Sequence, residues 1–134
     1  MKLSNLGATP PQEFELLDPF TQEPTGIKIT IHPIKSRIGK QAEHGMRQSI
    51  LKLMQDESNM IEVDGNKSLK AELIKEVSIQ MITDLTVSWE GIEDDHGEPI
   101  KFSKKACKKA YLENEEFTDA VYEYANDLGN FLKA

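Results

Sequence analysis

Apolar residues recur at every fourth position through the middle of the chain, and this recurrence constrains the fold more than any other feature. Positions four apart lie on one face of an α-helix, so the pattern predicts an amphipathic helix over residues 68–89. A helix of that length runs about 33 Å, and we expect it to form the spine of the domain. Its stripe consists of Leu69, Leu73, Val77, Met81, Leu85 and Trp89, widened by Ile74 and Ile82.

Three further helices are expected, each preceded by a residue whose side chain can cap a helix N-terminus. We place them at about 36–55, 103–112 and 114–133. The first contains Gly39 and Gly45, which weaken a helix by about 1 kcal/mol each relative to alanine. The alternative role of these glycines is to permit the close approach of another backbone. The expected caps are Ser36, Ser103 and Asn114.

The segment 12–32 has the pattern of two strands rather than a helix. Ile27, Ile29 and Ile31 alternate with polar residues, which places the three isoleucines on one face of a strand. Proline, glycine and aspartate separate this run from the preceding one, so we predict a β-hairpin with a long loop. A hairpin alone is marginal in water, and its isoleucine face needs a helix to cover it.

Two polar segments are expected to lack regular structure. Residues 1–11 predict a flexible arm, and residues 55–67 a flexible connection with a turn at Asp64 and Gly65. The rest, residues 12–134, is expected to form a single domain, a size that supports one modest core. We therefore predict an α+β fold that is mainly helical, with an N-terminal β-hairpin followed by about four helices.

The connection after the long helix is expected to fold back on itself. Trp89 and Gly91 precede an acidic turn at residues 93–98, and Pro99 and Phe102 follow it. The apolar ends of this segment must pack together while the polar turn stays in water. We therefore assign Trp89, Gly91, Pro99 and Phe102 to a structural clasp.

Charge is unevenly distributed along this acidic chain. The net charge of −7 argues against nucleic acid as the main ligand, because such a binder needs a basic face. Residues 28–47 carry five lysines and arginines against one glutamate, whereas residues 90–98 carry five acids and no base. This asymmetry either steers copies of the protein head to tail or reflects two solvated faces. A homo-oligomer is one expectation.

Composition also bears on location. The single cysteine, Cys107, cannot form an internal disulfide, which fits a reducing compartment. No apolar stretch approaches the roughly 20 residues that span a bilayer, and the N-terminus lacks the apolar run of a signal peptide. We expect a cytoplasmic protein that does not bind a membrane.

Candidate chemical sites are few. Cys107 lies among lysines that can lower a thiol pKa, but none of the histidines sits in a partner motif, and no glycine-rich nucleotide motif is present. The acidic residues and His96 at positions 93–98 offer hard ligands for a cation, yet their spacing is not that of a calcium-binding loop. We predict no enzyme activity and no cofactor, and keep a metal-gated regulator as an alternative.

The apolar stripes are the remaining candidates for binding. With 38% hydrophobic residues and a mean hydropathy of −0.51, the chain is expected to share apolar surface with a partner. A partner helix would dock on a stripe, although several stripe residues must belong to the core. The predicted contact residues are Ile38, Ala42, Met46, Met81 and Leu85.

Two motifs resemble the tail assembly chaperones of long-tailed bacteriophages and prophages, and the likeness extends over residues 13–132. The first is the clasp pattern, supported by aromatic and apolar positions in the last helices. The second is the hairpin loop. The motifs read Trp89-x-Gly91-Ile92 with Gly97-x-Pro99-Ile100-x-Phe102-Ser103, and Asp18-Pro19-x-Thr21-x-Glu23-Pro24-Thr25-Gly26-Ile27.

This resemblance implies a concrete function. Chaperones of that family bind the tape measure protein, a helical rod that sets tail length, and keep it soluble until tail tube protein polymerises around it. They act in the bacterial host cytoplasm, are not part of the mature virion, and many self-associate. A structural tail or neck component of the virion is the alternative within phage biology.

Overall fold

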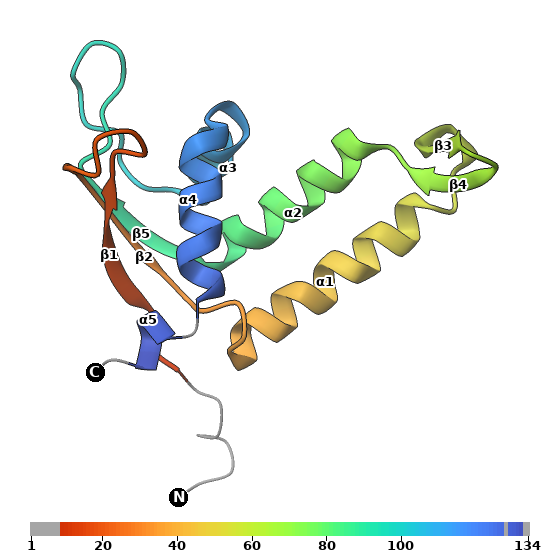
Figure 1. Cartoon of the computed structure of the whole chain (residues 1–134), viewed down its shortest axis with the longest axis horizontal. Coiled ribbons are helices and arrows are strands. Elements are labelled where there is room, and N and C mark those ends of the chain that lie inside the picture. Colours follow the sequence, from red (N-terminus) through yellow and green to blue (C-terminus); the bar gives the residue numbers. More distant parts are fainter. Residues whose placement is uncertain (1–8, 128, 133–134) are drawn as a thin grey trace, which may run out of the picture.

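A computed structural model describes residues 9–127 and 129–132 (Figure 1). Strands β1 (Gln12–Leu17), β2 (Pro24–Ile31) and β5 (Thr86–Glu90) form an antiparallel sheet with β2 in the middle. A second sheet pairs β3 (Met60–Val63) with β4 (Asn66–Leu69). With 49% helix and 24% strand, the fold is an α+β arrangement with two sheets, so the prediction of a mainly helical fold is wrong.

The predicted N-terminal hairpin is confirmed. Strands β1 and β2 pair with Phe14 opposite Ile29, and the side chains of Ile29 and Ile31 are fully buried. The loop between the strands is held by Asp18, whose carboxylate accepts hydrogen bonds from the backbone N–H groups of Phe20 and Thr21. The alternation of isoleucines therefore identified the buried face correctly.

The predicted long helix is wrong at both ends. Helix α2 spans Ala71–Leu85, and the following residues form strand β5. Thr86 and Val87 are β-branched and suit a strand, and pairing with β2 places Trp89 opposite Ile29. The backbone at Trp89 forms hydrogen bonds with the open edge of β2 and is therefore a strand. Its four-residue spacing from Leu85 is a coincidence. At the other end Leu69 belongs to β4.

The segment expected to be flexible is ordered. A short 3₁₀ turn, η2 (Glu57–Asn59), leads into the β3–β4 hairpin. The predicted turn is confirmed at Asp64 and Gly65, whose φ angles of 53° and 81° are both positive, as a two-residue hairpin turn of type I′ requires. Strand pairing thus replaces the loose connection that the polar composition suggested.

Helix α1 (Arg37–Leu53) begins at the predicted cap Ser36, whose hydroxyl oxygen accepts the N–H of Gly39. Helices α1 and α2 run antiparallel and project from the sheet as an arm, with β3 and β4 at its far end (Figure 1). At the base of the arm a Cβ atom on Gly39 would overlap the carbonyl oxygen of Ile34. Gly39 therefore permits close backbone approach, whereas a Cβ on Gly45 would meet nothing within 4 Å.

Helix α3 (Lys104–Glu113) begins at the predicted cap Ser103, which accepts the N–H of Ala106. The expected helix over 114–133 is instead α4 (Glu115–Asn126) followed by the short α5 (Gly129–Leu132), with Asp127 outside helical geometry. Asn114 makes no capping hydrogen bond, because its amide donates to the carbonyl oxygen of Ala110.

The core lies where the sheet meets helices α2, α3 and α4. Tyr111 is fully buried there, and its hydroxyl lies 2.8 Å from Oγ1 of Thr86. Thr86 donates its own proton to the carbonyl oxygen of Ile82, so Tyr111 is the donor in this pair. The core cluster is Ile29, Ile31, Ile34, Ile79, Ile82, Leu85, Trp89, Cys107, Tyr111, Val121, Ala125 and Phe131.

Residues 1–8 of the predicted arm lie outside the described residues. The single-domain boundary at residue 12 stays a prediction. Within residues 9–127 and 129–132, every helix is too short or too polar to cross a membrane.

Candidate partner-binding groove

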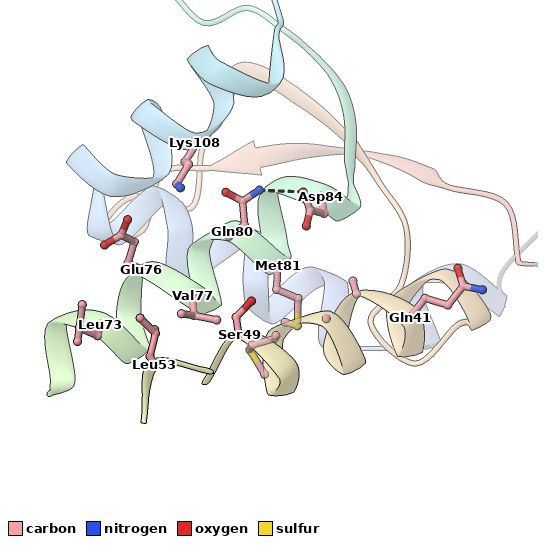
Figure 2. A pocket seen from close by; sticks show the side chains of 13 residues that line it. Gln41, Ser49, Leu53, Leu73, Glu76, Val77, Gln80, Met81, Asp84 and Lys108 are labelled. Carbon is pink, nitrogen blue, oxygen red and sulfur yellow. Dashed lines mark hydrogen bonds between the residues drawn. The ribbon is translucent and has the colours of Figure 1, made fainter. Parts of the chain in front are cut away.

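A groove of about 440 Å³ runs along the arm between helices α1 and α2 (Figure 2). Its floor is mainly apolar, and polar side chains lie along its rim. Lys108 reaches the rim from helix α3. The lining comprises Gln41, Ala42, Gly45, Met46, Ser49 and Leu53 from α1, Leu73, Glu76, Val77, Gln80, Met81 and Asp84 from α2, and Lys108.

Short side chains on α1 leave this space open. Ala42, Gly45 and Ser49 follow one another at intervals of three and four residues, so they lie on the face that meets the groove. From α2, Val77 and Met81 complete the floor. A trough with small residues on one wall and longer apolar residues on the other accepts side chains from a third helix.

The rim is partly fixed by hydrogen bonding. On α2 the side-chain amide of Gln80 donates to a carboxylate oxygen of Asp84 at 2.9 Å (Figure 2). Glu76 and Lys108 lie on the same side of the groove, and Gln41 lies at its other end (Figure 2). An apolar floor with a mixed polar rim suits the apolar stripe of an amphipathic helix.

The structure separates the predicted contact residues into three places. Ala42, Met46 and Met81 line the groove together, with Ala42 and Met46 half-buried and Met81 only 4% exposed at its base. Ile38 is 42% exposed at the start of α1, outside the groove lining. Leu85 is fully buried in the core, where no partner reaches it.

Sequence reasoning missed Gly45 and Ser49 as groove residues. Both interrupt the apolar stripe of α1 and are not apolar residues themselves, so an apolar pattern does not select them. The signal was present in the spacing of small residues, because a helix that presents alanine, glycine and serine at successive turns leaves room beside it.

The clasp residues also lie together, at the edge of the sheet where strand β5 ends and the acidic loop begins. Trp89 is 7% exposed, and its indole N–H donates to the carbonyl oxygen of Ile100 at 2.8 Å. The ring of Phe102 packs edge-on against the indole, with centroids 5.3 Å apart and planes at 85°. Pro99 pairs with Glu93 through an isolated antiparallel bridge. The two ends of the loop are therefore joined by both side-chain and backbone contacts.

Gly91 occupies the tightest point of the clasp. Its φ of +82° lies in the left-handed region, and a Cβ atom there would overlap the carbonyl oxygen of Gly26 in β2. Within the acidic turn, Asp94 accepts the N–H groups of His96 and Glu98 at 2.9 and 3.0 Å. The carboxylate of Asp94 thus orders the turn itself.

Among the described residues, few side chains are arranged as they would be in a metal-binding or catalytic site. No three His, Cys, Asp or Glu side chains in this part of the chain lie together as they would around a metal ion. Burial raises the pKa of the Cys107 thiol, and the side chain is fully buried. Lys104 donates to three carbonyl oxygens at the end of α2, those of Thr83, Asp84 and Thr86. These groups stabilise the fold.

Comparison with known proteins identifies a family. The family model described as YdaY prophage protein matches residues 37–134, which include α1, α2, the clasp and the C-terminal helices. No curated protein and no solved structure matches the chain. Since the match covers well over half of the chain, this protein belongs to the YdaY prophage protein family.

Proposed function

We propose that this prophage protein is a tail assembly chaperone without catalytic activity, and that the groove between α1 and α2 binds an amphipathic helix of the tape measure protein. Binding would keep the rod soluble in the bacterial host cytoplasm until tail tube protein polymerises around it. The chaperone would then leave, and would be missing from the mature virion.

The groove is the observation that carries this proposal. It lies between two helices that project from the sheet, so a third helix has access along the length of the arm. Met46, which is half-buried, supplies a flexible, polarizable side chain that adapts to partners of differing shape, and the buried Met81 forms the base beneath it. A rod-shaped partner presents many similar helical segments, and such a groove binds them without strict sequence specificity.

The modest size of the groove fits a partner that is covered by many copies. Burial of one leucine-sized side chain contributes about 1.5–3 kcal/mol, so a few anchors offset only part of the cost of association. Repetition along a rod raises the total through effective concentration. Weak single contacts also allow displacement when tail tube subunits arrive.

Two further observations support the phage context. Membership of a prophage protein family supports the phage context. The clasp and hairpin motifs resemble those of tail assembly chaperones, and both belong to ordered parts of the structure.

Co-expression with the tape measure protein of the same prophage tests the proposal. The rod should become soluble and co-purify with the wild-type chain. Ser49→Trp should fill the groove and abolish the complex, because Ser49 is an exposed residue of the lining. Gln48→Trp is the matched control, since Gln48 is exposed next to it and lies outside the lining.

Loss of solubility with both variants, or with neither, contradicts a role for the groove. Mass spectrometry of purified phage particles distinguishes a chaperone from a structural component. A chaperone should be missing from the particles, whereas a tail or neck component should be present in them. The metal-gated alternative has no supporting cluster among the described residues.

A further inference from the structure

A second hollow, of about 660 Å³, lies beside the clasp and away from the arm. Its walls come from the sheet, from the clasp and from helices α3 and α4. Trp89 and Ile100 belong to both the clasp and the hollow. The apolar part of the lining is Leu16, Ile27, Trp89, Ile92, Ile100, Ala106, Ala110 and Phe117.

Negative charge surrounds this apolar surface. Glu93, Asp95 and Glu113 are exposed on the rim, and Lys109 is the one cation among the lining residues. The ion pairs of Arg47 with Glu43 and of Lys67 with Glu57 lie elsewhere, the first on helix α1. The hollow therefore favours an apolar side chain flanked by positive charges.

The chain itself carries a surface of this kind on helix α1. At 100° per residue, Lys40, His44, Arg47 and Leu51 lie on one face, opposite the residues that line the groove. Leu51 is 57% exposed. Helix α1 holds four lysines and arginines against one glutamate, in a chain whose net charge is −7. That glutamate, Glu43, forms an exposed ion pair with Arg47, which Arg47 would share with or exchange for the acidic rim on docking.

We propose that the outer face of helix α1 of a second copy docks on the hollow beside the clasp, with Leu51 as the apolar anchor and Lys40 and Arg47 facing the acidic rim. The occupant is argued from charge complementarity. The two surfaces lie in different parts of the molecule, the hollow beside the clasp and α1 on the projecting arm (Figure 1). The contact is therefore head to tail, and each added copy leaves one surface of each kind free.

This assembly is compatible with the proposed function and independent of it. The groove and the outer face are on opposite sides of α1, so a copy joined to its neighbour still offers its groove. Copies arranged head to tail would present a row of grooves. The self-association itself needs no tape measure protein, and its failure would leave binding to the groove untouched.

Paired charge reversals test the contact in the isolated protein. The rim variant carries Glu93→Lys and Asp95→Lys, and the helix variant carries Lys40→Glu and Arg47→Glu. Each should weaken self-association at least roughly tenfold in sedimentation velocity, because like charges then face one another. A mixture of the two should associate again, since each variant keeps the surface that complements the other.

Several controls make the result specific. Glu13→Lys with Glu123→Lys changes the net charge by the same amount as the rim variant, at exposed sites outside both surfaces, and should leave association unchanged. Leu51→Ser should weaken association without reversing charge. Wild-type association should also fall between about 0.1 M and 1 M salt, as the Debye length shortens from about 10 Å to about 3 Å.

A wild-type chain that stays monomeric at every concentration and salt level would overturn the proposal. So would a dimer that neither double variant affects, or a mixture of variants that fails to associate. Circular dichroism of each variant confirms that loss of association is not loss of folding.

Discussion

Replacement of Gly91 by alanine should destabilise the protein far more than the same change at Gly97. Both glycines have positive φ angles, +82° and +77°, and both lie in the connection after β5. They differ in their surroundings. A Cβ on Gly91 would lie closer than 3.0 Å to the carbonyl oxygen of Gly26, whereas a Cβ on Gly97 would meet nothing within 4 Å.

The magnitudes follow from two separate costs. An alanine in the left-handed region costs about 1–2 kcal/mol of unfolding free energy, and both variants lose this amount. Gly91→Ala adds the cost of moving packed backbone, about 1–3 kcal/mol. We therefore expect a loss of about 2–5 kcal/mol for Gly91→Ala and about 1–2 kcal/mol for Gly97→Ala.

Urea denaturation followed by tryptophan fluorescence measures both losses. Trp89 is the single tryptophan of the chain and belongs to the clasp, so its emission reports unfolding at the site that is changed. Equal losses of unfolding free energy in the two variants would refute the close contact between Gly91 and β2. A larger loss for Gly97→Ala would refute it as well.

Three further predictions concern the core and the arm. Burial raises the pKa values of Cys107 and Tyr111, so as pH rises the unfolded chain releases these protons before the folded chain does. The free energy of unfolding, measured in urea, should therefore fall as pH rises through the ordinary pKa values of 9.0 and 10.0. Tyr111→Phe should reduce that pH dependence. Lys104→Met should cost about 1–3 kcal/mol in urea denaturation, because it removes the charged donor from the end of α2, and an unchanged midpoint would contradict that role. Gly39→Ala should lower the melting temperature through backbone overlap, whereas Gly45→Ala should raise it by strengthening the helix, and a rise for both would show that no backbone approaches Gly39.

Local patterns predicted the elements whose partners are close in sequence. The alternation of isoleucines identified the buried face of β2, and Ser36 and Ser103 marked helix starts because capping needs only a neighbouring N–H group. The turn at Asp64 and Gly65 was visible for the same reason. Each of these features depends on contacts within a few residues.

The errors came from contacts between distant segments. Thr86–Glu90 became a strand because β2, more than fifty residues earlier, offered an open edge for pairing. Periodicity alone could not separate Trp89 from the preceding helix. Leu85 belongs to the apolar stripe of α2, but its side chain is fully buried in the core. The sequence predicted only some of the apolar residues of the groove. The space beside Gly45 and Ser49 depends on how α1 and α2 pack against each other, which local patterns do not specify.

Site-specific photo-crosslinking tests most directly whether the groove between α1 and α2 binds a helix of the tape measure protein. A photoreactive phenylalanine analogue would replace Ser49 in one variant and Gln48 in another, each co-expressed with the tape measure protein of the same prophage. We predict crosslinks from position 49 to apolar residues spaced three and four apart in the tape measure protein, and few from position 48. Equal crosslinking from both positions, or none from position 49, would contradict binding in the groove.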